Sequence, residues 1–193
     1  MNLEDKEISY TTTNSYSTLN SLTNTTKNVW FVCHGMGYLS RYFLRYFEGL
    51  DAADNYIIAP QAQSKYYIPP KFKHVGASWL TKENTLKETE NVMRNFDAIL
   101  EAENVSKTMS LIFLGYSQGV SIATRWVAAR KINCNHLILH SGGIPSELEP
   151  EDFSHLKKTS KVSYTYGNKD PYIDGVRITQ ETIKGNRLFG KYL

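Results

Sequence analysis

The sequence predicts an α/β protein, built as a three-layer α/β/α sandwich around a mostly parallel sheet. Short apolar runs rich in β-branched and aromatic residues recur along the chain and end in Gly, Pro or Ser, which is typical of buried strands. Longer stretches between them carry apolar residues at spacings of three, four and seven, which places those residues on one helical face. Strands separated by helices need crossover connections, and these favour a parallel sheet covered on both faces.

The individual elements follow from these two patterns. The apolar runs predict buried strands at 29–33, 56–59, 110–114, 136–140 and 161–166. The helical spacing predicts amphipathic helices at 84–103, 118–132 and 175–184.

The segment 9–28 is dominated by Ser, Thr and Asn, a composition compatible with a disordered arm. Tyr10, Tyr16, Leu19 and Leu22 favour order, because Thr and Tyr suit strands and the Asn-Ser pairs suit turns. We therefore expect an N-terminal antiparallel hairpin of short edge strands, with a disordered arm as the alternative.

Length and composition predict one globular domain over 1–193. A chain of 193 residues buries about 70% of its unfolded surface, and 41% hydrophobic with 21% charged residues is an ordinary globular balance. The longest apolar run, 29–33, is far shorter than the roughly 20 residues that span a bilayer. The acidic start lacks the apolar core of a secretory signal. We expect a cytoplasmic protein without integral membrane association.

Charge and cysteine content exclude further classes. The 22 basic and 19 acidic residues leave a net charge of +3 and are dispersed along the chain, which argues against a nucleic-acid partner. Cys33 and Cys134 lack the spacing of a disulfide framework or a zinc site, so we expect two buried free thiols. Neither a metal nor a cofactor is predicted.

The strand predicted at 110–114 runs into Gly115-Tyr-Ser-Gln-Gly119 and then into a helix. This is the Gly-x-Ser-x-Gly pattern, in which a tight, strained turn lifts a serine hydroxyl clear of the sheet. The flanking glycines let neighbouring backbone pass without a Cβ clash. The pattern predicts Ser117 as a nucleophile, and the alternative is a glycine turn that only packs the helix on the strand.

Two further strand ends supply the groups that such a serine requires. The strand at 29–33 runs into His34-Gly-Met-Gly37, whose turn can aim backbone N–H groups at a developing oxyanion; Met36 and Gln118 are the candidate donors. His34 and Gly35 are expected to brace this turn. Asp170, just past the strand at 161–166, stands where the orienting carboxylate of a triad belongs, although it is also a common turn former.

The long segment 61–79 is aromatic and interrupted by prolines. Loops of this length in a compact domain are often functional, so we expect an acyl-binding wall or lid that uses Tyr66, Tyr67 and Trp79. The alternative is a hydrophobic cluster that packs on the sheet.

With these sites the chain resembles the α/β-hydrolase superfamily and, within it, the phospholipase/carboxylesterase group of small serine esterases. The resemblance covers nearly the whole chain and rests on Trp30-Phe-Val-Cys-His-Gly-Met-Gly37, Ile58-Ala-Pro60, Gly76-Ala-Ser-Trp79, Gly115-Tyr-Ser-Gln-Gly119, Ser141-Gly-Gly-Ile-Pro145 and Tyr166-Gly-Asn-Lys-Asp170. It implies hydrolysis of carboxylic esters, thioesters or lysophospholipids without a metal or cofactor. It also implies Ser117 as nucleophile, Asp170 as triad acid, and Met36 and Gln118 as oxyanion donors.

The sequence departs from this family at the general base. Members of the family continue past the acid to a Gly-His, whereas none of the five histidines here follows Asp170. We therefore expect a fold that lacks its last strand and helix, truncated before the catalytic histidine. His140 is the first substitute to consider, followed by His74. The alternative function is an inactive pseudo-hydrolase that binds a small apolar ligand or a protein partner.

The loss of a final strand would leave a neighbouring strand edge unpaired. We therefore predict aggregation or a homodimer through that edge, and lower solubility and stability than in a full-length relative. Size-exclusion chromatography with light scattering checks this, and a monomer that melts cooperatively at an ordinary temperature would contradict it.

Overall fold

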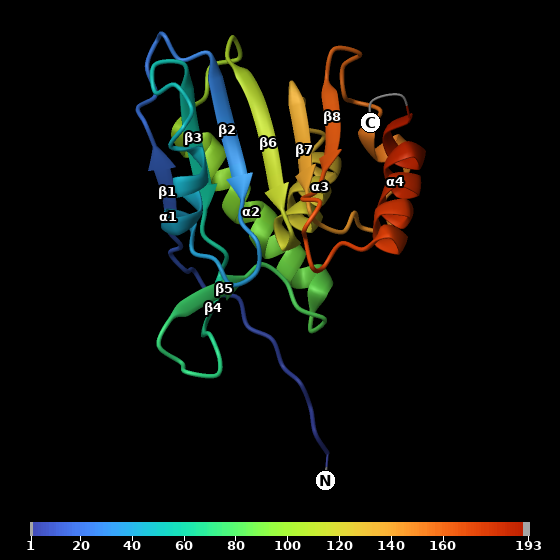
Figure 1. Cartoon of the computed structure of the whole chain (residues 1–193). Coiled ribbons are helices and arrows are strands. Elements are labelled where there is room, and N and C mark those ends of the chain that lie inside the picture. The colour runs from blue at the N-terminus through green and yellow to red at the C-terminus, as the bar shows by residue number, and fades with distance from the viewer. Residues whose placement is uncertain (1, 191–193) are drawn as a thin grey trace.

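The computed structural model describes residues 2–190 and contains a six-stranded sheet (Figure 1). The strands lie in the order β1-β3-β2-β6-β7-β8, and every pair is parallel except β1 with β3. Their bounds are β1 Tyr16–Leu19, β2 Asn28–Cys33, β3 Asn55–Pro60, β6 Ser110–Tyr116, β7 His136–His140 and β8 Lys161–Thr165. The predicted α/β class and mostly parallel sheet are confirmed.

The helices follow the predicted amphipathic stretches closely. The bounds are α1 Ser40–Phe43, α2 Thr85–Glu103, α3 Gln118–Ala129 and α4 Gly175–Phe189, with short 3₁₀ turns η1 Leu44–Phe47 and η2 Pro150–Phe153. Helix α3 ends three residues before its predicted end at 132, and α4 runs five residues past its predicted end at 184.

The strands bury alternate residues on the two faces of the sheet, because successive side chains of a strand point to opposite sides. Phe31, Phe113 and Leu137 lie in the larger cluster, which includes residues of α2, α3 and α4. Val32 and Ile57 lie in the second cluster with Phe43 of α1 and Phe47 of η1. Two apolar layers thus flank the sheet, as the sandwich architecture requires.

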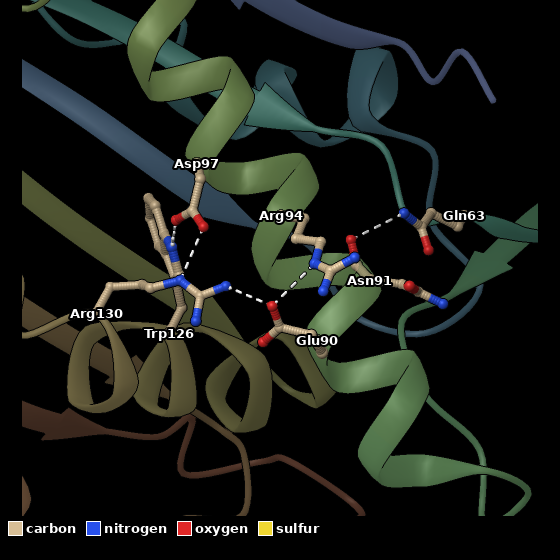
Figure 2. A network of polar contacts seen from close by, with 7 residues as sticks. All are labelled: Gln63, Glu90, Asn91, Arg94, Asp97, Trp126 and Arg130. Carbon is tan, nitrogen blue, oxygen red and sulfur yellow. Dashed lines mark hydrogen bonds and ion pairs between the residues drawn. The ribbon is translucent and has the colours of Figure 1, made fainter. Parts of the chain in front are cut away.

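Helices α2 and α3 are joined at their surface by a polar network (Figure 2). The Arg130 guanidinium contacts Asp97 at 2.8 Å and Glu90 at 2.9 Å, and Glu90 also pairs with Arg94 at 3.0 Å. Asp97 also accepts a 2.7 Å hydrogen bond from the indole N–H of the buried Trp126. A buried indole N–H needs a hydrogen-bond partner. Asp97 therefore supplies the acceptor for Trp126 in the core and also pairs with Arg130 at the surface.

The predicted N-terminal hairpin is wrong. Within the described part of segment 9–28 the only strand before β2 is β1, and it pairs antiparallel with β3 in the register Tyr16 to Pro60. A strand needs only an available edge, and β3 offers one. The hairpin of this chain lies elsewhere: β4 Ser64–Tyr67 and β5 Val75–Ser78 pair antiparallel inside the segment predicted as a long loop.

Cys33 and Cys134 are both buried and free, as predicted. Burial raises the pKa of both thiols, that of Cys134 to about 12, because the charged thiolate is disfavoured away from water. Within residues 2–190 no helix combines the length and the apolar character that crossing a bilayer requires.

Candidate active site

The candidate site lies at the carboxyl ends of the parallel strands, at the lower edge of the sheet in Figure 1. The His34 turn follows β2, the Ser117 turn follows β6, Ser141 follows β7, and the segment with Asp170 follows β8. Parallel strands bring their carboxyl ends to one edge, so turns far apart in sequence meet there.

Ser117 occupies a strained turn between β6 and α3. Its φ of 53° and ψ of −117° lie outside the regions that non-glycine residues normally occupy. Backbone hydrogen bonds hold this turn. The Ser117 N–H donates to the His140 carbonyl at 2.9 Å, and the Ser117 carbonyl accepts from the Val120 N–H at 3.1 Å. Ser117 therefore lies in a strained turn between a strand and a helix.

The two candidate oxyanion donors belong to neighbouring turns. Gln118 is the first residue of α3, and N–H groups of a first helical turn have no partner inside the helix. Met36 lies in the turn after β2, and among the described residues its N–H makes no backbone hydrogen bond. Within residues 2–190, neither the Met36 N–H nor the Gln118 N–H makes a hydrogen bond.

His34 is fully buried at the start of this turn. Its Nδ1 lies 2.8 Å from the Gly35 carbonyl oxygen, and its Nε2 lies 3.2 Å from the Ala62 N–H. An Nδ1–H donor and an Nε2 acceptor satisfy both contacts, which requires the neutral imidazole. Burial lowers the pKa of His34 to about 4, although the bond to Gly35 raises it in part. Both ring nitrogens of His34 are therefore engaged in holding backbone.

Asp170 lies beside a cavity of about 330 Å³ at the ends of β7 and β8. Its Oδ1 accepts a 2.9 Å hydrogen bond from the Tyr172 N–H. The cavity is lined by Tyr116, His140, Ser141 and residues 167–172. Since β7 lies between β6 and β8, the two strands that lead to Ser117 and Asp170 are two strand spacings apart, about 10 Å at roughly 4.8 Å each.

His140 is the histidine that lines this cavity. Its Nδ1 lies 2.9 Å from Thr165 Oγ1, and its ring stacks on Tyr116 at 5.6 Å. The remaining histidines face other parts of the fold: His136 contacts Ser163, His155 contacts the Ile132 carbonyl, and His74 lies on the turn of the β4–β5 hairpin. Among the hydrogen bonds of residues 2–190, none joins a histidine to the Ser117 hydroxyl.

Tyr116, which lines the cavity, belongs to a cluster of tyrosines with Tyr38 and Tyr46. Tyr116 contacts Tyr38 edge to face at 6.0 Å, and the Tyr38 and Tyr46 hydroxyls lie 3.1 Å apart. Burial and the charge of Asp170 raise the pKa of Tyr116, and the Tyr46 bond with burial raises that of Tyr38 to about 12. The phenols of Tyr116 and Tyr38 therefore stay neutral at physiological pH. The sequence did not predict this tyrosine cluster. Tyr116 occupies a variable position of the Gly-x-Ser-x-Gly pattern, so the pattern gives no indication of its role.

The structure separates the three aromatic residues expected to form an acyl wall. Tyr66 and Tyr67 are exposed on β4, whereas Trp79 is 1% exposed and packs on His34 and Phe96. Trp79 therefore lies in the core behind the His34 turn, and the tyrosines lie on the outer hairpin. The described residues contain no group of three or more His, Cys, Asp or Glu side chains placed to hold a metal ion.

Several solved structures of similar fold carry the names of esterases or thioesterases. Acyl-protein thioesterase 2 from Zea mays has a TM-score of 0.65 and 14% identity, over 91% of this chain and 86% of that one. A carboxylesterase from Bacillus cereus has a TM-score of 0.60 and 15% identity, over 91% and 81%. A phospholipase/carboxylesterase from Dyadobacter fermentans has a TM-score of 0.57 and 19% identity, over 90% and 82%. The sequence matches no protein-family model and no curated protein.

Proposed function

From the α/β-hydrolase fold of this chain, we propose that it is a serine hydrolase of carboxylic esters, thioesters or lysophospholipids. Ser117 is the nucleophile, Asp170 the carboxylate that orients the base, and the Met36 and Gln118 N–H groups stabilise the oxyanion. One observation carries the proposal: Ser117 is held at φ 53°, and within residues 2–190 the Met36 and Gln118 N–H groups beside it make no hydrogen bond. A purely structural turn has no need of that strain.

The chemistry follows from this arrangement. The Ser117 hydroxyl attacks the ester carbonyl, the carbonyl oxygen becomes an oxyanion, and the two N–H groups stabilise its charge as it develops. A base removes the hydroxyl proton and returns it to the leaving alcohol or thiol, which leaves an acyl-serine for water to hydrolyse. Of the five histidines, His140 lines the same cavity as Asp170, so it is the one to test as the base.

A second candidate function is supported by one observation. Since no described hydrogen bond gives the Ser117 hydroxyl a base, the same pocket also suits a pseudo-hydrolase that binds a small apolar ligand or a protein partner without turnover.

The deciding experiment is the intact mass of the protein after exposure to a fluorophosphonate. We expect one phosphonyl adduct per chain on the wild type and none on Ser117→Ala, because only an activated serine attacks phosphorus. Asp170→Asn is expected to slow the reaction, and His140→Gln tests the base directly. Each protein is first shown to melt cooperatively, so that absence of an adduct cannot be due to unfolding.

The outcomes separate the two functions. A Ser117-dependent adduct that His140→Gln abolishes supports a hydrolase with His140 as its base. An adduct that persists in His140→Gln supports the hydrolase and excludes His140. A folded wild type that forms no adduct contradicts the hydrolase and leaves the binding function.

A further inference from the structure

The side chain of Gln118 makes contacts that its predicted oxyanion role does not use. Its Oε1 accepts from the Trp79 N–H at 2.8 Å, and its Nε2 donates to the Leu80 carbonyl at 2.7 Å and to Ser78 Oγ at 3.0 Å. A backbone donor and a backbone acceptor fix the orientation of the carboxamide, because the reversed amide would oppose both. Hydrogen bonds of the Gln118 side chain therefore connect the Ser117 turn to residues 78–80.

The same short segment holds the turn that carries Met36. The Gly37 N–H donates to the Ala77 carbonyl at 2.8 Å, and the Trp79 indole N–H donates to the His34 carbonyl at 2.7 Å. The Gly76 and Gly37 backbones pass so closely that a Cβ on Gly76 would lie 2.6 Å from the Gly37 carbonyl oxygen. Backbone contact and hydrogen bonds thus fix the turn against residues 76–79.

We propose that the Gln118 carboxamide is a positioning group that sets the two oxyanion N–H groups relative to each other through residues 76–80. One donor belongs to Gln118 itself, and the other belongs to the turn that Ala77 and Trp79 hold. Apart from the clamp formed by these contacts through residues 76–80, the two turns are held by the pairing of β2 with β6, which extends to Cys33 and Gly115. This inference rests on the proposed function, because the spacing of the two donors matters only where an oxyanion forms between them.

The main test is Gln118→Glu, which keeps an oxygen for the Trp79 N–H and replaces the donor to the Leu80 carbonyl with an acceptor. The matched control is Asn55→Asp at the opposite end of the sheet. The Asn55 Oδ1 accepts from the Trp30 indole at 2.9 Å and its Nδ2 donates to the Asp51 carbonyl at 3.0 Å, so the control loses a bond of the same kind. Trp79→Phe removes the indole bond to His34 and tests the second link.

The first readout is amide hydrogen exchange, which needs no activity. We expect the Gly37 and Trp79 amides to exchange faster in Gln118→Glu, and the Gly37 amide to exchange faster in Trp79→Phe. Neither amide should change in Asn55→Asp. Unchanged Gly37 exchange in a folded Gln118→Glu protein would overturn the inference.

The second readout is kinetic. A misplaced donor weakens binding of the transition state more than that of the substrate, so Gln118→Glu should lower kcat on p-nitrophenyl acetate by roughly 100-fold with little change in KM. Asn55→Asp should keep kcat within about threefold of the wild type, because a change far from the site acts on stability and not on the donors. Faster exchange with unchanged kcat would also overturn the inference.

A wild type that forms no fluorophosphonate adduct contradicts the proposed function, while the exchange experiment still decides whether the clamp couples the two turns.

Discussion

Gly119→Ala is expected to lower the free energy of unfolding by about 3 kcal/mol or more. Gly119 lies in the first turn of α3, and a Cβ there would meet the Cys33 carbonyl group, lying 2.7 Å from its carbon and 2.9 Å from the His34 carbonyl oxygen. These distances are well inside the ~3.5–4 Å optimum of non-bonded heavy atoms, and the atoms are backbone, which cannot rotate away. The gain in helix propensity, about 1 kcal/mol for Ala over Gly, is smaller than this cost.

The measurement is the urea midpoint of unfolding for the wild type and the variant. Gly49→Ala is the matched control, because a Cβ at Gly49 would meet no atom within 4 Å. Gly49→Ala should leave the free energy of unfolding unchanged or raise it by up to about 1 kcal/mol, because Ala lowers the conformational entropy of the unfolded chain. A Gly119→Ala protein as stable as this control would show that β2 and α3 are not packed as closely as the structure has them.

Acidification is expected to remove roughly 3 kcal/mol of stability through His34. The folded protein lowers the pKa of this imidazole from 6.5 to about 4, chiefly because burial disfavours the charged ring. Between these two values the unfolded chain binds the proton and the folded chain does not. The contribution of His34 is therefore complete above about pH 6.5 and is lost as the pH falls through about 4.

The comparison that isolates this contribution is the pH dependence of unfolding in the wild type and in His34→Gln. Carboxylates titrate in both proteins, and so does His136, whose pKa burial and Lys161 also lower. Their effects cancel in the difference. We expect His34→Gln to be less stable at neutral pH but to lose less stability on acidification, and equal losses in the two proteins would contradict the prediction. The turn that carries Met36 should loosen over the same pH range, because the charged ring can no longer accept the Ala62 N–H bond.

The sequence by itself determined the five parallel strands, the three long helices and the turns that follow the strands. Each of these depends on near neighbours. Short apolar runs predict β2 and β6, a repeat of three and four predicts α2, and Gly115 and Gly119 around Ser117 predict the strained turn. Such patterns are local, so they can be recognised without knowledge of the fold.

Only the tertiary structure decided which of these elements meet. β1 pairs with β3 instead of forming a hairpin, because the edge of β3 lies open. The sequence of a single strand does not specify which strand lies beside it. Trp79, expected to line an acyl pocket, is buried against His34.

The site shows the same division. Sequence reasoning placed the Gln118 N–H in the oxyanion site, but the partners of its side chain lie about 40 residues earlier in the chain, at Ser78 and Leu80. Likewise, His140 and Asp170 share a cavity because β7 and β8 are adjacent in the sheet. Contacts between segments so far apart are fixed by strand order and packing, which local patterns do not encode.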